Sequence, residues 1–354
     1  DGVAGIVADA RPHGRVSLTT AAASHAARAL PLHTVSGISA GGFMAIQHHV
    51  AFSRTVTGVG VVAGGPFWCS QGLLDVALTS CMTTPALISV SELVAITHTT
   101  ALSGFIDAPS HLKDDSVWLF SGRDDSVVNS GVVSKVMQYY SDLGIKNIAM
   151  VNSVEAEHSM PTNAWGNPCG FKGEPYINNC AYDAAGNILL HILNSSALPK
   201  AALRPPVAAI SSNIIQFPQR PFYSGNNWKA TGLAQYGFAY VPRTCAEMGD
   251  RLFGKQLGAQ NGSSAPCRLH VAYHGCLQSY HQVNSSYVKH AGYNEWAEAN
   301  SILMLYPQTL ASLVNPKGCW DWWGYTGSAF ASNAGVQLAT VRNMVHRVFS
   351  VEMK

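Results

Sequence analysis

Short apolar runs alternate along this chain with longer segments in which apolar residues recur every three or four positions. The runs are too short for helices and rich in β-branched residues, so we expect them to form buried strands. The predicted strands are 33–38, 56–63, 116–120, 146–151, 237–241, 269–273 and 302–306. The predicted helices are 41–51, 130–143, 184–193, 284–299 and 330–350, whereas 66–112 is expected to be irregular or weakly helical.

Strands separated by helices are typical of the α/β class, in which helices cover both faces of a mostly parallel sheet. The proline-rich segment 199–219 has the composition of a linker. Because strands resume beyond it, we interpret this segment as an internal crossover. The pattern therefore predicts one α/β domain over residues 1–354.

The composition narrows the class of protein. A hydrophobic share of 47% and a charged share of 12% exclude a disordered chain, which needs the opposite balance. A net charge of +2 provides no basic surface of the kind that binds nucleic acid. The uncharged stretch 55–74 contains too many glycines, and a proline, for a spanning helix. We therefore expect a soluble globular protein with no membrane span and no nucleic-acid partner. Independently of the composition, we expect it to be a monomer.

The eight cysteines fall into four pairs that are close in sequence. None lies in a Cys-x-x-Cys motif or at zinc-ligand spacing from a histidine, so we expect no metal site. Paired cysteines indicate disulfides and a secreted protein, and eight reduced, buried thiols are the alternative. A signal peptide, if there was one, is not present in this sequence. The predicted pairs are Cys69 with Cys81, Cys169 with Cys180, Cys245 with Cys267, and Cys276 with Cys319.

The turn after the first predicted strand reads Gly37-Ile38-Ser39-Ala40-Gly41. It matches the Gly-x-Ser-x-Gly nucleophile elbow, whose glycines permit a tight turn from strand to helix and leave the serine hydroxyl clear of the sheet. In a chain with 32 glycines, a glycine-rich turn with a solvated serine is the alternative. The strand before and the helix after favour a nucleophile at Ser39.

A serine nucleophile needs a base, and an acid that orients the base. Asp124 and Asp125 follow the strand 116–120, and either could instead cap the next helix. His158 follows the strand 146–151, although a lone loop histidine is more often only solvated. The order serine, acid, histidine, each after its own strand, is that of the α/β-hydrolases.

Ester cleavage also needs donors for the developing oxyanion. The backbone N–H of Ala40 is one candidate. A His-Gly segment of the usual kind is missing upstream of Ser39 and occurs late instead, as His274-Gly275-Cys276 after the strand 269–273. We therefore expect a circularly permuted α/β-hydrolase, with an ordinary turn at His274 as the alternative.

Residues 319–325 contain four aromatic side chains after the strand 302–306. Buried aromatics are mostly core, but on a loop at the site they could form a wall for an apolar substrate. A disulfide from Cys276 to Cys319 would tie this loop to the oxyanion segment.

These residues resemble the polyhydroxybutyrate depolymerases, particularly their single-domain fungal type. The resemblance runs from about residue 32 to the C-terminus through 36–44, 63–66, 269–280, 292–297, 305–308 and 318–322. It implies a permuted α/β-hydrolase fold and matches all eight cysteines. It places the nucleophile on Ser39, the acid on Asp125, the histidine on His158, the oxyanion donors on the N–H groups of Ala40 and Cys276, and a crevice tryptophan on Trp322.

The resemblance has gaps at 1–31, which we treat as an extension, and at 71–115, and the loop 308–319 is shorter than in the fungal type. We expect no separate substrate-binding domain. We expect a secreted serine esterase that cuts a short-chain polyhydroxyalkanoate, acting on a polymer surface or oligomer without a cofactor. The alternatives are a carboxylesterase for another ester, such as an aromatic polyester, a feruloyl ester or a short acyl ester, and a non-catalytic binding protein on the same scaffold.

Overall fold

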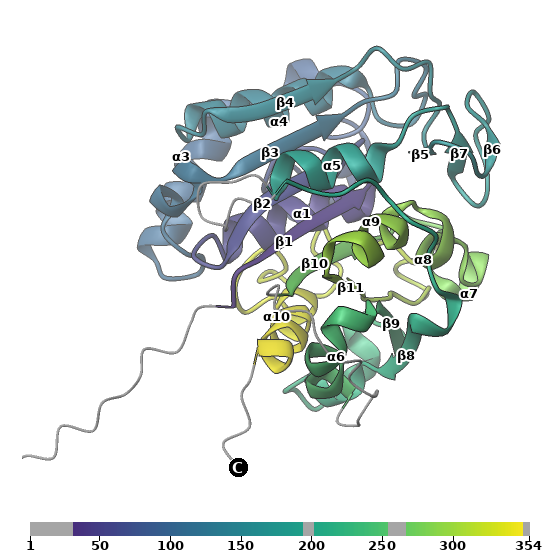
Figure 1. Ribbon diagram of the computed structural model, residues 1–354. Helices are drawn as coiled ribbons and strands as arrows, with labels where there is room; N and C mark the ends of the chain where they lie inside the picture. Colours follow the sequence, from purple (N-terminus) through teal and green to yellow (C-terminus); the bar gives the residue numbers. More distant parts are fainter. Residues whose placement is uncertain (1–30, 194–201, 254–266, 350–354) are drawn as a thin grey trace, which may run out of the picture. The chain divides into compact units, whose positions relative to one another are not determined.

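A mixed sheet lies at the centre of the computed structural model, which describes residues 31–193, 202–253 and 267–349 (Figure 1). Within these residues the strand order is β4-β3-β2-β1-β10-β11-β9-β8. The strands are β1 His33–Ile38, β2 Val56–Val62, β3 Ser116–Phe120, β4 Asn147–Val151, β8 Ile214–Pro218, β9 Tyr236–Tyr240, β10 Arg268–Tyr273 and β11 Ile302–Tyr306. All neighbours from β4 to β11 pair in parallel, whereas β9 is antiparallel to both β11 and β8.

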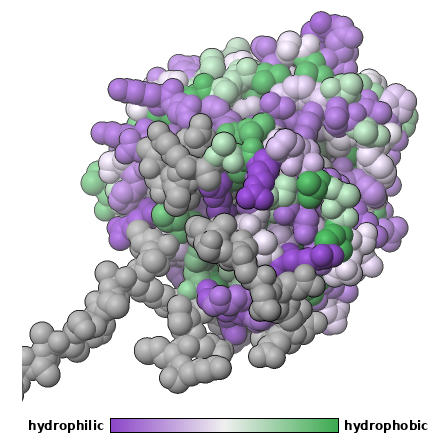
Figure 2. Space-filling model, in the orientation of Figure 1, coloured by the Kyte–Doolittle hydropathy of each residue, from purple (hydrophilic) through white to green (hydrophobic). Residues whose placement is uncertain are grey.

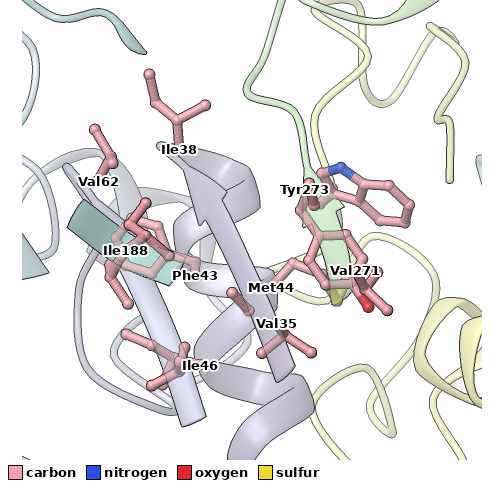
Figure 3. Close-up of a cluster of buried hydrophobic side chains, with 14 of the residues drawn as sticks. Val35, Ile38, Phe43, Met44, Ile46, Val62, Ile188, Val271 and Tyr273 are labelled. Atoms are coloured by element: carbon pink, nitrogen blue, oxygen red, sulfur yellow. The ribbon is translucent and has the colours of Figure 1, made fainter. Parts of the chain in front are cut away.

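Helices cover both faces of this sheet. In β2, a Cβ on Gly60 would overlap the side chain of Ile188 in α5 (Ala184–Ile192), whereas Val61 packs against Gly42 in α1 (Ala40–Ala51). Since successive residues of a strand point to opposite faces, α5 and α1 lie on opposite sides. Every residue of β1, β2 and β3 is buried, as expected for strands covered on both faces. Figure 3 shows part of the resulting core, to which β1, β2, β10, α1 and α5 contribute side chains.

The helices vary widely in length. They are α1 Ala40–Ala51, α2 Leu74–Leu78, α3 Val90–Leu102, α4 Ser130–Asp142, α5 Ala184–Ile192, α6 Ala246–Phe253, α7 Tyr280–Val283, α8 Ser286–His290, α9 Tyr293–Asn300 and α10 Val336–Phe349. A small second sheet contains β5 Met160–Thr162, β7 Ile177–Asn179 and β6 Asn167–Pro168. No helix in the described ranges is both long and apolar enough to span a bilayer. On the face in Figure 2, polar and apolar side chains are interspersed.

Several sequence-based predictions of elements are wrong. The segment 284–299 is not one helix: Gly292, at φ 90°, separates α8 from α9, and Asn284, at φ 52°, ends α7. The segment 66–112 contains the regular helix α3, whose few buried positions give a weak periodicity. The predicted crossover 199–219 includes the edge strand β8. The last helix begins at Val336 rather than near 330.

Four disulfides join the cysteines in the pairs predicted from the sequence. Of the predicted N-terminal extension 1–31, only Pro31 belongs to the described residues. The strand that leads to Ser39 is the first of the described strands, yet it lies inside the sheet between β2 and β10.

Candidate active site

Ser39 occupies a strained turn between β1 and α1. Its backbone has φ 55° and ψ −125°, a conformation that L-residues rarely adopt. A Cβ on Gly37 would overlap the carbonyl of Gly41, and a Cβ on Gly41 would overlap the carbonyl of Tyr273. Both glycines of the elbow are therefore required by close backbone contacts. The N–H of Ser39 donates to Val62 O at 2.9 Å, which anchors the turn to β2.

Asp125 and His158 form the hydrogen-bonded pair that the sequence predicts. The Nδ1 atom of His158 lies 2.9 Å from Oδ2 and 3.1 Å from Oδ1 of Asp125. The Asp125 side chain is 2% exposed, and its Oδ1 also accepts the N–H groups of Val127 and Val128, each at 2.9 Å. With Nδ1–H donating to the carboxylate, the Nε2 atom of His158 is left as the acceptor. The ring is thus held in the tautomer that a general base needs.

Asp124 is excluded as the partner of His158. Its side chain is 53% exposed, and its Oδ1 lies 3.9 Å from Nε of Arg123, a surface pair of little energetic weight. Asp125, on which the resemblance places the acid, is therefore the aspartate that contacts His158.

The turn 274–276 lies directly beside the elbow. A Cβ on Gly275 would be 3.3 Å from Cβ of Ser39, so this segment runs along the serine. Gln278 holds the turn from one side: its Oε1 accepts the N–H of Gly275 at 2.7 Å, and its Nε2 donates to Tyr176 O at 2.9 Å. A disulfide connects Cys276 to Cys319. The Cys276 N–H is thus carried on a rigid segment.

His274 supports the same turn from inside the core. Its Nδ1–H donates to Gly275 O at 2.7 Å, and its Nε2 accepts the N–H of Thr309 at 3.2 Å. Burial lowers the pKa of His274 to about 4. A neutral ring is what these two backbone partners require, so His274 is a positioning residue rather than a proton donor to substrate.

A cavity of about 360 Å³ brings the predicted site residues together. Ser39, His158, Cys276 and Trp322 all line it. Most of the remaining lining is apolar, contributed by α2, the loop after Asp125 and the loop 314–319. The cavity can therefore hold an apolar acyl chain next to a serine hydroxyl and an imidazole.

The aromatic loop is both core and cavity wall. Trp320 is fully buried and packs edge-on against Tyr273. Trp322 faces the cavity and is 6% exposed. Asp321 shapes the loop by accepting backbone N–H groups from Trp323 through residue 326. Trp320 thus lies in the core, whereas Trp322 is buried in the core and also lines the cavity.

Sequence reasoning missed the link between the two loops that carry Asp125 and His158. Glu157, 6% exposed, accepts the N–H of Ser126 at 2.8 Å and also accepts its hydroxyl. The only signal was a carboxylate next to the candidate histidine. Gln278 was missed as well, since no local pattern shows that it reaches the turn and Tyr176.

The described residues contain no cluster of three or more histidine, cysteine or acidic side chains that could hold a metal ion. The cavity lining includes the hydroxyl-bearing Ser39 and the imidazole of His158, whose hydrogen-bond partner is the Asp125 carboxylate. Such a set is suited to acyl transfer through a serine.

The mostly parallel sheet, covered on both faces and turning at Ser39 into α1, defines an α/β-hydrolase fold. No protein-family model matches the chain. Among known proteins, it is 42% identical over 319 residues to the poly(3-hydroxybutyrate) depolymerase of Delftia acidovorans, spanning 90% of this chain but only 59% of that protein. It is 32% identical over 357 residues to the polyhydroxybutyrate depolymerase of Talaromyces funiculosus, spanning 93% of this chain and 95% of that protein.

Solved structures show the same likeness. A PHB depolymerase with a serine-to-alanine substitution, complexed with an R3HB trimer, matches with a TM-score of 0.76 at 29% identity, over 90% of this chain and 96% of that one. The crystal structure of PHB depolymerase from Penicillium funiculosum matches with a TM-score of 0.75 at 30% identity, over 91% and 96%. The chain belongs to the polyhydroxybutyrate depolymerase family.

Proposed function

We propose that the protein is a serine esterase that hydrolyses poly(3-hydroxybutyrate) or a related short-chain polyhydroxyalkanoate to hydroxyacid oligomers. The observation that carries this proposal is the Asp125–His158 hydrogen bond at the edge of an apolar cavity that Ser39 also lines. Family membership supports the substrate class, and the related structure with an R3HB trimer supports a polyester ligand.

The reaction follows from the residues in the cavity. Ser39 Oγ attacks the ester carbonyl while Nε2 of His158 accepts its proton. The Asp125 carboxylate orients the ring and stabilises the imidazolium that forms. The N–H groups of Ala40, at the start of α1, and of Cys276 stabilise the oxyanion. His158 then protonates the leaving alkoxide, and water hydrolyses the acyl-enzyme by the same steps.

The permuted chain order is part of the proposal. In the usual order, strands equivalent to β8–β11 precede the nucleophile strand, and here they follow it. We treat the chain as one catalytic domain that acts as a monomer without a cofactor. Secretion is supported by the four disulfides, which persist in oxidising compartments.

The test compares two substrates. Clearing of poly(3-hydroxybutyrate) film with release of hydroxyacid oligomers is expected, together with hydrolysis of p-nitrophenyl butyrate. Ser39→Ala protein, shown to be folded, is the control and should do neither. Turnover of the soluble ester alone would assign the protein to carboxylesterases for another ester. If the unmodified protein shows neither activity, the result would favour a non-catalytic binding protein on the same scaffold.

A further inference from the structure

Two lysines bring positive charge to the lining of the cavity beside Ser39. Lys172 and Lys317 line it, and its lining includes no aspartate or glutamate among the described residues. Among the described residues, neither Lys172 nor Lys317 forms an ion pair with a carboxylate. The other lining residues are mostly apolar, so the two ammonium groups are suited to bind an anionic part of a ligand in this cavity.

Lys172 is held on the side of the cavity where His158 lies. Its Nζ donates to Oγ of Ser126 at 2.8 Å, and that hydroxyl donates in turn to the buried Glu157. Ser126 follows Asp125, and Glu157 precedes His158. An ammonium group has three N–H donors, so the contact with Ser126 fixes its position and leaves donors for a ligand.

Lys317 belongs to a different wall. Its backbone carbonyl accepts the N–H of Leu277 at 2.8 Å, directly after the proposed oxyanion donor Cys276. Lys317 is exposed and lies two residues before Cys319, which forms a disulfide with Cys276. The two lysines thus provide a natural comparison, because both carry charge to the cavity but only Lys172 is tied to the loops of Asp125 and His158.

The ligand chemistry follows from the direction of the reaction. His158 protonates the leaving oxygen, so the leaving part of the ester lies on its side of the cavity. In a hydroxyacid oligomer cut at its last ester, that leaving part ends in a free carboxylate one short unit away. We infer that Lys172 binds the terminal carboxylate of a hydroxyacid oligomer on the leaving-group side of the scissile ester.

This inference rests on the proposed function and extends it. Binding of the acid end would favour short, soluble oligomers and would direct cleavage to the ester nearest that end. The carboxylate itself takes no part in bond breaking. Inside an intact polymer chain such ends are rare, so the contact would matter for oligomers and little for film.

The experiment measures binding in a Ser39→Ala background, by calorimetry with a 3-hydroxybutyrate trimer as the free acid and as its methyl ester. Lys172→Met should reduce the preference for the acid about fivefold, the range of a partly exposed charge pair. Lys172→Arg should keep the preference, and added salt should weaken it. Lys317→Met tests whether any positive charge in the cavity lining gives the same preference for the acid. The control is Lys113→Met, because Lys113 is exposed and lies outside the cavity lining.

Three results would overturn the inference. Lys172→Met could weaken the binding of the free acid and of the methyl ester equally, or it could leave the preference for the acid unchanged. The third result is that the trimer does not bind at all. A larger effect of Lys317→Met would do the same. Failure of the proposed function would be seen in a different experiment, because the unmodified protein would then hydrolyse neither film nor p-nitrophenyl butyrate. The binding constants test the role of Lys172 independently of that result.

Discussion

Trp322 lies flat against Phe43, with their ring centroids 3.9 Å apart and their planes 16° apart. Both side chains are buried, and both line the cavity beside Ser39. The hydroxyl of Ser70 donates to Trp322 O at 2.6 Å and holds its backbone. The stack joins α1 to the aromatic loop and forms one wall of the crevice.

Replacement of Trp322 by alanine should reduce film hydrolysis about tenfold more than hydrolysis of p-nitrophenyl butyrate. The apolar wall contributes about 25 cal/mol per Å² of contact with a polymer unit, whereas the small activated ester needs little of it. The stack on Phe43 also predicts a loss of about 3–5 kcal/mol in unfolding free energy. Trp322→Phe is the matched control, and equal loss of both rates would give Trp322 a core role only.

Ser39 allows stability and activity to be separated. Ser39→Ala should lower kcat by several orders of magnitude without a change in melting temperature. Ser39→Gly should be equally inactive yet more stable than Ser39→Ala by about 1 kcal/mol, because glycine adopts φ 55° and ψ −125° without the strain of a side chain. Kinetics and thermal melts on both variants provide the check. Normal turnover by folded Ser39→Ala would disprove the proposed nucleophile.

The two aspartates should differ sharply. Asp125→Asn keeps the shape but loses the carboxylate that accepts from Nδ1 of His158, so kcat should fall by about three to four orders of magnitude. Asp124→Asn removes an exposed charge and should change kcat less than about twofold. The measurement is kcat for p-nitrophenyl butyrate with each variant, and the reverse ranking would contradict the assignment.

Local signals explain what the sequence predicts well. Ser39, Asp125 and His158 each follow a buried strand, and such strands are visible as apolar runs. The direction of β9 is not visible in this way, because residues alternate between faces in parallel and antiparallel strands alike. The edge strand β8 ends in Pro218 and is half-buried, so it reads as a loop. The contact of Glu157 with Ser126 joins two loops and has no local signature.

A chain of neutral rings crosses the core beside β1. Nδ1–H of His33 donates to Pro31 O at 2.8 Å, so its Nε2 must accept from Nε2–H of His48 at 3.2 Å. Nδ1 of His48 then accepts the hydroxyl of Tyr273 at 2.5 Å. Burial lowers the pKa of His33 to about 4 and that of His48 well below its ordinary value. Protonation of either ring would break this sequence of donors and acceptors.

The protein should therefore lose stability steeply in acid. Burial also lowers the pKa of His270 to about 3 and that of His274 to about 4, against an ordinary 6.5. The unfolded chain binds protons first, so the stability is fully present above pH 6.5 and is lost as pH falls toward 4 and below. Each such histidine contributes up to about 1.4 kcal/mol per pH unit in this window.

Thermal melts between pH 7 and pH 4 provide the measurement. His270→Gln keeps groups able to bond the hydroxyls near the ring but cannot take up the proton, so its melting temperature should depend less on pH. A melting temperature that is flat over this range in the unmodified protein would contradict the buried neutral rings.

The position of β1 has a consequence for synthesis of the chain. Thr34 in β1 pairs with His270 in β10 across 236 residues of sequence. At roughly 5–20 residues per second, the ribosome needs tens of seconds to supply that partner, and until then one edge of β1 stays unpaired. During this interval β1 to β4 can assemble, but the turn that carries Cys276 does not yet exist. Esterase activity should therefore appear only after β10 has joined, which makes it a reporter of translation through at least Cys276.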